Sequence, residues 1–327
     1  MSVKNWIACM TTAVLLLGLA LPAYADSTKP ITLRMVTFTP TASPTAKPAF
    51  WLRDQIKKRT DGKLTIKIIG GPEAIPSDNQ PMAVRNGVFD MILSPPDESL
   101  IPESLCFILS TQTPAQEREG GFYDLMAEVY RKQNVLYLGR AAVDNEFHIM
   151  LASKHVQKPE DLAGLKLRAS GTTLPLIKAL GAAPVSVPLP DVYTAMERGV
   201  VDGTIGVKTG LKTWGLASVV KYTINQPLYG QNLVILVNLA SWKKLPQEYQ
   251  TIMMDTMVSL ESGELAELYT RRSKNALQSA FEKGMQLIDF SAPDAKRLVD
   301  LAHKVMWDEI TKKAPEYAPK FRQIMPR

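Results

Sequence analysis

Two distant stretches of this chain repeat one pattern. Residues 83–92 read Ala-Val-Arg-Asn-Gly-Val-Phe-Asp-Met-Ile, and residues 195–204 read Ala-Met-Glu-Arg-Gly-Val-Val-Asp-Gly-Thr. In both stretches a helix is predicted to end on a glycine, where a left-handed cap is easy, and an Asp then leads into a short apolar strand. Because the unit recurs far apart, the sequence favours two similar α/β lobes. The alternative is that such units are simply common in α/β proteins.

Strands and helices alternate around both stretches. Residues 31–37 alternate apolar and polar side chains, as a half-buried strand does. The predicted elements are strands at 31–37, 63–69, 164–168 and 185–187, with helices at 49–59 and 174–180. This alternation indicates an α/β fold with parallel sheets covered by helices on both faces.

Residues 247–283 form the longest helical segment of the sequence. They contain no proline and are rich in Glu, Leu, Met, Ala, Lys and Arg. The pattern predicts one long helix or two helices joined at Gly263. At about 1.5 Å per residue the segment could reach on the order of 50 Å, which exceeds one lobe, so it could lie across both.

The first 25 residues are predicted to be a secretory signal peptide. Lys4 precedes an apolar stretch at 6–21, and Ala23 and Ala25 supply the small residues that a signal peptidase requires. The stretch is short for a membrane anchor, which needs about 20 apolar residues. Only Cys106 remains after cleavage, so no internal disulfide can form. An exported chain without an anchor or a disulfide is expected in a bacterial periplasm.

Composition and motifs argue against several other classes of protein. The formal charge of +6 is spread along the chain without the basic stripe and reading motif that nucleic-acid binding needs. No Gly-x-Ser-x-Gly elbow or phosphate loop occurs, and the three histidines lack a zinc-binding spacing. We therefore expect a protein that is not an enzyme and holds no metal or cofactor. A periplasmic hydrolase with an active site built from distant residues is the alternative.

Residues 159–203 resemble the extracytoplasmic solute receptors of TRAP (tripartite ATP-independent periplasmic) transporters, the DctP-like family. The matching segments are Pro-Glu-Asp-Leu-Ala-Gly-Leu-Lys-Leu-Arg at 159–168, Ala-Leu-Gly-Ala-Ala-Pro-Val at 179–185, Asp-Val-Tyr-Thr-Ala-Met at 191–196 and Gly-Val-Val-Asp-Gly at 199–203. Their order, spacing and identity match those of the family, and weaker similarity covers nearly the whole mature chain.

The resemblance implies a two-lobe periplasmic binding protein fold with a long helix spanning both lobes. Lobe I would comprise residues 26–146 and about 236–270, and lobe II would comprise residues 147–235 and about 271–327. The implied function is to capture a small organic carboxylate between the lobes and deliver it to one small and one large membrane subunit. A sensor accessory that presents the same ligand to a receptor kinase is the alternative. A monomer is expected.

Arg168 is the residue of this sequence that matches the family's carboxylate-binding arginine. An argument from the residues agrees, because ligands of open α/β sheets bind beyond the carboxyl ends of strands, and Arg168 ends a predicted strand. A guanidinium meets a carboxylate with two parallel hydrogen bonds. The helix predicted to begin near Thr173 also offers free N–H groups to an anion. The alternative role of Arg168 is a structural salt bridge.

Two positions depart from the family pattern. The family commonly has an Asn that contacts the ligand where this sequence has Gly206. Many members also have a second arginine, and its place in this sequence is taken by Phe147 or His148. His148 is either a partly buried polar residue or a hydrogen-bond donor to an anion. These departures put a polar sialic-acid-like or dicarboxylate ligand in doubt.

The remaining candidates for the ligand site are mainly aromatic or polar residues near the expected cleft. Besides Arg168, Gly206 and His148, the predicted ligand-binding residues are Phe38, Glu73, Ser170, Tyr193, Trp214, Tyr229 and Asn232. One carboxylate clamp in a more apolar pocket favours a monocarboxylate with an apolar or aromatic body. A polar hydroxy acid, sugar acid or dicarboxylate is the alternative, and Phe38, Trp214 and Tyr229 could instead pack the core.

Overall fold

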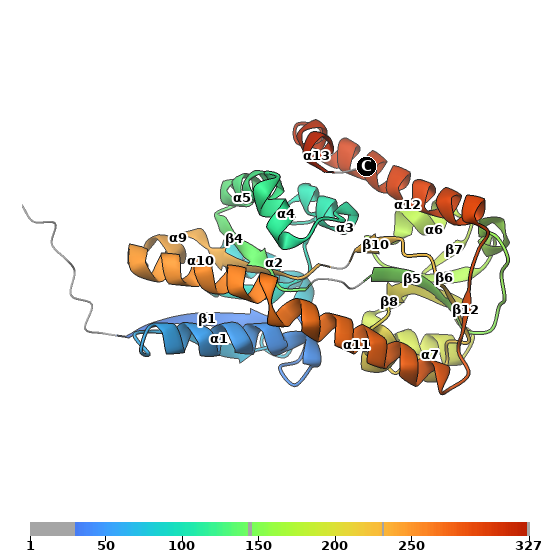
Figure 1. Ribbon diagram of the computed structural model, residues 1–327, viewed down its shortest axis with the longest axis horizontal. Helices are drawn as coiled ribbons and strands as arrows, with labels where there is room; N and C mark the ends of the chain where they lie inside the picture. The colour runs from blue at the N-terminus through green and yellow to red at the C-terminus, as the bar shows by residue number, and fades with distance from the viewer. Residues whose placement is uncertain (1–29, 143–145, 231, 326–327) are drawn as a thin grey trace, which may run out of the picture.

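The chain folds into two α/β lobes, each built around its own sheet (Figure 1). A computed structural model describes residues 30–142, 146–230 and 232–325, with the backbone alone for residues 264–269. The predicted signal peptide, residues 1–25, lies outside the described residues. The two-lobe α/β fold predicted from the sequence is confirmed.

The sheet of the first lobe has five strands in the order β2-β1-β3-β11-β4. β1 is parallel to β2 and β3, whereas β11 runs antiparallel between β3 and β4, so the sheet is mixed rather than wholly parallel. The strands are β1 (Ile31–Thr37), β2 (Leu64–Gly70), β3 (Met91–Ser94), β4 (Val135–Arg140) and β11 (Val234–Asn238).

Helices cover both faces of this sheet, because alternate strand residues are apolar on each side. Leu33 and Met35 of β1 pack with α1 and α10, and Val36 packs on the other face with α3 and α5. The helices are α1 (Lys47–Arg59), α2 (Gln80–Arg85), α3 (Cys106–Leu109), α4 (Pro114–Glu119), α5 (Phe122–Lys132), α9 (Leu239–Lys243) and α10 (Gln247–Ser262).

The sheet of the second lobe follows the order β12-β9-β5-β8-β6-β7, with the two-residue strand β10 beside β5. β5 is the antiparallel strand here, between β8 and β9. The strands are β5 (Glu146–Leu151), β6 (Lys166–Ala169), β7 (Ala183–Ser186), β8 (Gly203–Val207), β9 (Tyr222–Ile224), β10 (Tyr229–Gly230) and β12 (Gln286–Ile288).

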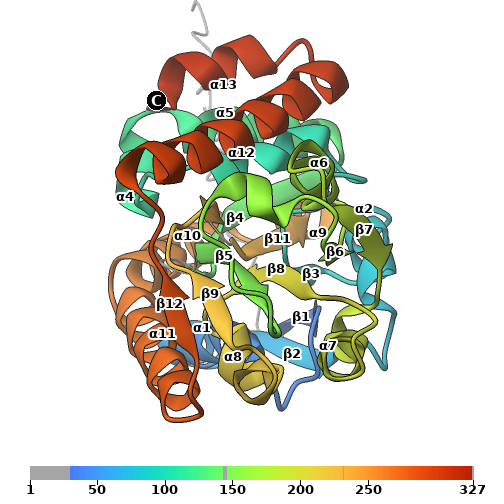
Figure 2. The same cartoon turned by 90° about the vertical axis from the view of Figure 1, so that its right-hand side faces the viewer.

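The second sheet also has helices on both faces (Figure 2). Met150 of β5 packs with α7, α8 and α11, whereas Ile149 and Leu151 pack on the other face with α6 and α12. The helices are α6 (Leu174–Ala179), α7 (Val192–Glu197), α8 (Gly210–Thr213), α11 (Glu264–Phe281) and α12 (Ala292–Lys313), and α13 (Ala318–Ile324) follows α12 and packs on the first lobe. No helix in the described ranges is long and apolar enough to cross a membrane.

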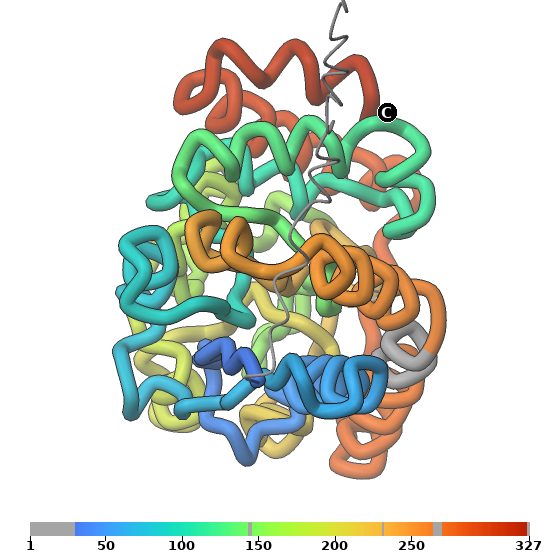
Figure 3. The backbone as a smooth tube through the Cα atoms, turned by 90° about the vertical axis from the view of Figure 1, so that its left-hand side faces the viewer, coloured from blue at the N-terminus to red at the C-terminus, as the bar shows by residue number. Residues whose placement is uncertain are grey.

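The helical segment predicted at 247–283 is two helices joined at Gly263. α10 packs on α1 and β4 of the first lobe, and α11 packs on α8 of the second. Gly263, with φ of −127° and ψ of −106°, breaks the helix between them. Figure 3 shows α10 beside α1, with α11 continuing from its end. The predicted helical brace across both lobes is therefore confirmed as a pair of helices.

A second helix, α12, also contacts both lobes. It packs against α6 of the second lobe and against α3 and the 3-10 turn Pro102–Leu105 of the first lobe. α13 follows it and packs on α5 (Figure 1). The sequence predicted this region as helical, but nothing local in it indicated which lobes it joins.

The repeated sequence unit is a repeated structural unit. After α2, Gly87 has φ of +74°, and after α7, Gly199 has φ of +69°. In each unit the next N–H donates back into the helix: Val88 N to Ala83 O and Val200 N to Ala195 O, both at 2.9 Å. Each glycine therefore ends its helix in the left-handed conformation that the sequence predicted.

The aspartate of each unit then fastens the next strand to its parallel neighbour. Asp90 Oδ2 accepts from Arg34 N of β1 at 2.8 Å, and Asp202 Oδ2 accepts from Lys166 N of β6 at 2.8 Å. β1 and β3 of the first lobe are thus equivalent to β6 and β8 of the second lobe.

Candidate functional site

The carboxyl ends of β6, β7 and β8 meet at one edge of the second sheet, where the predicted site lies. Arg168 of β6 pairs in register with Val185 of β7 and with Thr204 of β8. Thr204 in turn pairs with Met150 of β5. Because paired residues point to the same face of a sheet, Arg168, Thr204 and Met150 share the face that α7, α8 and α11 cover.

Arg168 is a half-buried cation without an anion. Its Nε–H donates to Val187 O at 2.9 Å, and among the described residues its guanidinium forms no ion pair. Burial lowers the pKa of Arg168 below its usual value because it removes water from the charge. The alternative role in a structural salt bridge has no support in the described residues.

Gly206 ends up beside Trp214, which follows α8. A Cβ atom placed on Gly206 would lie 3.4 Å from Cζ3 of Trp214, and one placed on Gly210 would lie 2.5 Å from Cε3. The same position on Gly206 is 3.8 Å from the Thr204 methyl and 3.9 Å from Met150 Sδ. The indole therefore occupies space next to the sheet where a larger residue at 206 would project.

His148 lies opposite Gly206 on the neighbouring strand. It is fully buried, and its Nδ1 is 2.9 Å from Ile224 O. Its Nε2 lies 3.6 Å from Glu146 Oε2, an electrostatic contact rather than a hydrogen bond, and Lys208 Nζ lies 3.0 Å from the same oxygen. His148 and Lys208 lower the pKa of Glu146 to about 2. These charges tie the start of β5 to the end of β8.

Ser170 and Tyr193 lie near the same edge. The Ser170 N–H donates to Thr173 Oγ1 at 3.0 Å, and Ser170 O accepts from Thr173 N and Leu174 N. The N–H groups of Ser170, Thr173 and Leu174, at the start of the helix that was expected to favour an anion, are thus already used within the loop. The ring of Tyr193 lies 3.6 Å from a Cβ position on Gly215, next to Trp214.

Phe38 and Glu73 lie beyond the carboxyl ends of β1 and β2, on the first lobe. Phe38 is half-buried and packs against the core between the sheet and α1. Glu73 is exposed, and its Oε1 accepts from Gly71 N at 2.7 Å. That backbone N–H and the one of Glu73 itself lower the pKa of Glu73.

Tyr229 and Asn232 lie on the segment that returns from the second lobe to the first. Both are buried. The Tyr229 hydroxyl donates to Ala302 O of α12 at 3.1 Å, and Asn232 Nδ2 donates to Phe107 O at 2.5 Å. These bonds attach the crossing segment to α12 and α3.

The structure thus divides the ten predicted residues into three places. The carboxyl edge of the second sheet has Arg168, His148, Ser170, Tyr193, Gly206 and Trp214, the corresponding edge of the first sheet has Phe38 and Glu73, and the crossing has Tyr229 and Asn232.

Sequence reasoning missed two residues at these edges. Thr204 pairs with Arg168 and touches the space beside Gly206. Glu98, in the loop after β3, reaches the second lobe: its Oε1 is 2.9 Å from a Cβ position on Gly171, and its Oε2 is 2.6 Å from Lys313 Nζ. Alternation along β8 could have indicated Thr204, but no local signal indicates the contact of Glu98.

Other buried or half-buried charges of the first lobe pair with one another. Arg140 Nη1 is 3.0 Å from Glu117 Oε1, and Arg118 Nε is 2.8 Å from Glu261 Oε2. Burial raises the pKa of Glu117 in spite of its arginine partner. Arg118 and Arg140 line a hollow of about 790 Å³ between α4, α10, α12 and the crossing segment. Because each has its own carboxylate, these arginines differ from Arg168.

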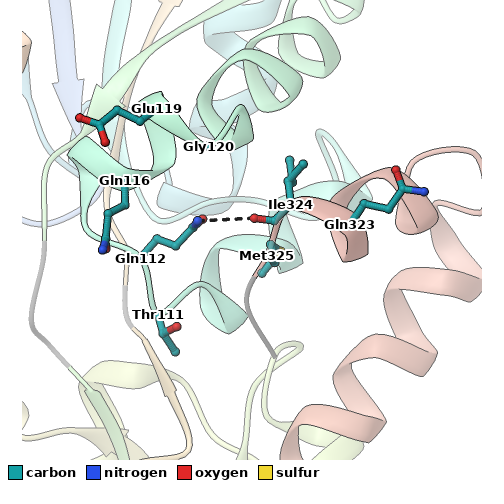
Figure 4. Close-up of a pocket in the computed structure, with 8 residues that line it drawn as sticks. All are labelled: Thr111, Gln112, Gln116, Glu119, Gly120, Gln323, Ile324 and Met325. Atoms are coloured by element: carbon teal, nitrogen blue, oxygen red, sulfur yellow. Dashed lines mark hydrogen bonds between the residues drawn. The ribbon is translucent and has the colours of Figure 1, made fainter.

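A second hollow lies between α4 and α13 (Figure 4). Gln112 Nε2 lies 3.5 Å from Ile324 O across it. Its lining residues come from the helices that join the C-terminal segment to the first lobe, away from β6 and β8. Within the part of the chain that the structure describes, no group of three His, Cys, Asp or Glu residues could hold a metal ion.

Residues 35–313 match the sequence model of a family described as "Bacterial extracellular solute-binding protein, family 7". The match covers well over half of the chain, which therefore belongs to this family of solute-binding receptors. The family description places its members outside the cytoplasm.

Individual relatives agree with this assignment. The chain is 24% identical over 306 residues to a monocarboxylate 2-oxoacid-binding periplasmic protein of Nostoc sp., covering 89% of this chain and 81% of the relative. It is 31% identical over 150 residues to a C4-dicarboxylate-binding periplasmic protein of Rhodobacter capsulatus, covering 45% of this chain and 44% of the relative.

A solved structure shows the same fold. The TRAP periplasmic solute-binding protein of Desulfovibrio salexigens with bound orotic acid superposes with a TM-score of 0.78 at 19% sequence identity, over 90% of this chain and 96% of that one.

Proposed function

We propose that this chain is the periplasmic receptor of a TRAP transporter and binds a small organic carboxylate between its lobes, with Arg168 pairing with the carboxylate. The uncompensated guanidinium of Arg168 carries this proposal. The buried Arg140 and the half-buried Arg118 lie beside carboxylates of the chain, whereas Arg168 has no such partner in the described residues. A bound carboxylate would supply the missing charge with two parallel hydrogen bonds.

The ligand that fits this edge best is a monocarboxylate with an apolar or aromatic body. Gly206 offers no side-chain donor, and beside it lie the half-buried indole of Trp214 and the buried Thr204 methyl and Met150. The names of two similar proteins agree, since one binds 2-oxoacids and the other binds orotic acid. The alternatives are a polar hydroxy or sugar acid, or a dicarboxylate as in the name of the Rhodobacter capsulatus relative.

The partners in transport would be the small and large membrane subunits of the transporter. The lobes would close over the ligand by a hinge motion, since the closed form would be the one that the ligand stabilises. The receptor itself would act as a monomer and without chemistry on its ligand. A sensor accessory is the alternative role, and neighbouring genes for two multi-span membrane proteins would favour transport.

Binding can be tested on the mature chain, beginning at Asp26. The protein is unfolded and refolded to remove any bound ligand, and its melting temperature is measured with a panel of small acids. A ligand at 100 times its Kd stabilises the folded state by about 2.7 kcal/mol, which gives a clear rise in melting temperature. Mass spectrometry of molecules released from freshly purified protein identifies the natural ligand. If no acid of a broad panel changes the melting temperature, the proposal fails.

A further inference from the structure

Trp214 lies flat against one glycine with its edge toward another. A Cβ on Gly210 would lie 2.5, 2.7 and 3.1 Å from Cε3, Cζ3 and Cδ2 of the indole, and a Cβ on Gly206 would lie 3.4 Å from Cζ3. Contacts below 3.0 Å are not tolerated, so any side chain at 210 would displace the ring, whereas a Cβ at 206 would make ordinary van der Waals contact with its edge. Figure 2 shows α8, which carries Gly210 and leads to Trp214, beneath the second sheet.

Backbone conformation does not explain either glycine. Neither Gly206 nor Gly210 has a positive φ, unlike Gly199 and Gly215 in the same lobe. Gly206 lies inside strand β8, where glycine is less favourable than alanine. The space that the indole occupies is therefore the physical reason for Gly210, and a side chain larger than a methyl group at 206 would meet the same ring.

The indole lies at the same edge of the sheet as Arg168. The two are linked through Thr204, which pairs in register with Arg168 and whose methyl lies 3.8 Å from the Gly206 Cβ position. Trp214 is half-buried, with one side packed among Leu211, Val192 and their neighbours. The edge thus combines one cation with an adjacent flat apolar surface.

We infer that Trp214, seated against Gly206 and Gly210, selects the body of the ligand and favours carboxylates that carry a flat unsaturated ring over small or hydroxylated acids. This inference rests on the proposed function. A ring stacked on an indole buries apolar area without needing a partner for a hydroxyl group. A hydroxylated chain at the same place would lose hydrogen bonds to water and gain none from glycine.

The test uses calorimetric titration of the refolded mature chain with benzoate, orotate, pyruvate and malate. Trp214→Leu keeps an apolar side chain but removes the flat surface. We expect it to weaken binding of benzoate and orotate at least tenfold and binding of pyruvate less than threefold, with Trp214→Phe in between. A uniform loss for all acids, or no loss for the ring acids, overturns the inference.

Gly206→Asn changes the surroundings of the indole without replacing the indole itself. It adds an amide and pushes on the indole edge, so we expect the preference to shift from benzoate toward malate. Gly199→Asn, in the same lobe and remote from the indole, adds the same amide at a left-handed position that Asn tolerates, so it is the matched control and should leave the preference unchanged. Equal preference in Gly206→Asn and wild type counts against the inference.

A spectroscopic measurement covers variants that fold poorly. The mature chain has four tryptophans, and a ring acid on Trp214 should change the fluorescence of the wild type. Trp214→Phe should abolish that change while retaining binding. A fluorescence change that persists in Trp214→Phe overturns the inference. If no acid binds even the wild type, the proposed function fails and the inference falls with it. If acids bind through Arg168 without regard to Trp214, the inference alone fails.

Discussion

The two repeated units of this molecule have the same framework and different side chains at one position. The first unit runs β1, α1, β2, α2, β3 along the chain, and its strands lie in the order β2-β1-β3. The second unit runs β6, α6, β7, α7, β8, and its strands lie in the order β7-β6-β8. Asp90 and Asp202 make the same hydrogen bond at the same place. The equivalents of Arg168 and Thr204 are Val36 and Ile92, which also pair in register.

This difference bears on the role of Arg168. Val36 and Ile92 are completely buried in an apolar core, so the framework accepts two apolar residues at these positions. The second lobe has a half-buried arginine and a threonine there, and the arginine has no carboxylate partner among the described residues. Because the framework accepts apolar residues at this position, the comparison supports the proposal that Arg168 binds a ligand.

Exchanging the residues between the two units should have the largest effect. Val36→Arg places an unpaired charge in a closed apolar core and should lower the free energy of unfolding by about 3–5 kcal/mol. Arg168→Val should change it by less than about 1 kcal/mol, because it removes a charge that lacks a partner. Urea unfolding measures both. A large loss in Arg168→Val would show that Arg168 supports the fold and would break the comparison.

Affinity for the ligand should depend strongly on Arg168. Arg168→Ala removes one partner of a desolvated charge pair, which typically costs about 2–5 kcal/mol, so binding should weaken about 30-fold or more. Arg168→Lys should also weaken it, because an ammonium cannot supply two parallel hydrogen bonds. Calorimetric titration with an acid that stabilises the wild type measures this.

A matched arginine on the surface controls for the change in net charge. Arg297 pairs with Asp294 and Glu160 on the surface of the second lobe. Arg297→Ala should leave ligand affinity unchanged. Wild-type affinity in Arg168→Ala would remove Arg168 from the site.

The two aspartates should show that the frameworks are alike. Asp202→Ala removes the acceptor for Lys166 N and should destabilise the protein by about 1 kcal/mol. Asp90→Ala should cost more, because Asp90 also accepts from Arg34 Nε and from the Ser241 hydroxyl at 2.7 Å. Thermal unfolding of both variants checks the order. The reverse order would mean that the two units are fastened differently.

The smallest effect should appear in acid. Folding lowers the pKa of Glu146 from 4.5 to about 2, so its contribution to stability is present above about pH 4.5 and is lost as the pH falls toward 2. Because the Glu146 side chain is 41% exposed, the contribution should stay below about 1 kcal/mol. Glu146→Gln should melt below the wild type at pH 6, with the gap narrowing below about pH 4.5 and closing near pH 2. A constant gap would contradict the assignment.

Much of the fold was predictable because its signals are local. Alternation at residues 31–37 identified β1 with its observed bounds, and the absence of proline after Pro246 identified the helices α10 and α11. The glycine caps of both units were predicted from Gly87 and Gly199 alone, since a left-handed residue strongly favours glycine. Each of these signals lies within a few residues of the structure that it predicts.

The candidate site was predictable only in part. The position of Arg168 at the end of its strand followed from the strand pattern and the family resemblance. The packing of Trp214 against Gly206 and Gly210 did not follow from the sequence, because it consists of contacts in space that no local pattern indicates. Phe38 and Glu73 were expected at the ligand, and the structure places them at the edge of the other lobe without deciding their role.

By itself, the sequence determined that two similar α/β units occur in this chain and that an arginine lies near the end of a strand in the second. Caps, strand alternation and helix composition act over a few residues, so they can be seen without coordinates. Only the tertiary structure decided that β11 inserts between β3 and β4, that Glu98 reaches Gly171, and that Arg168 has no carboxylate beside it in the described residues. Those outcomes depend on which distant surfaces pack together, and the free energy of such packing is not encoded in any one segment.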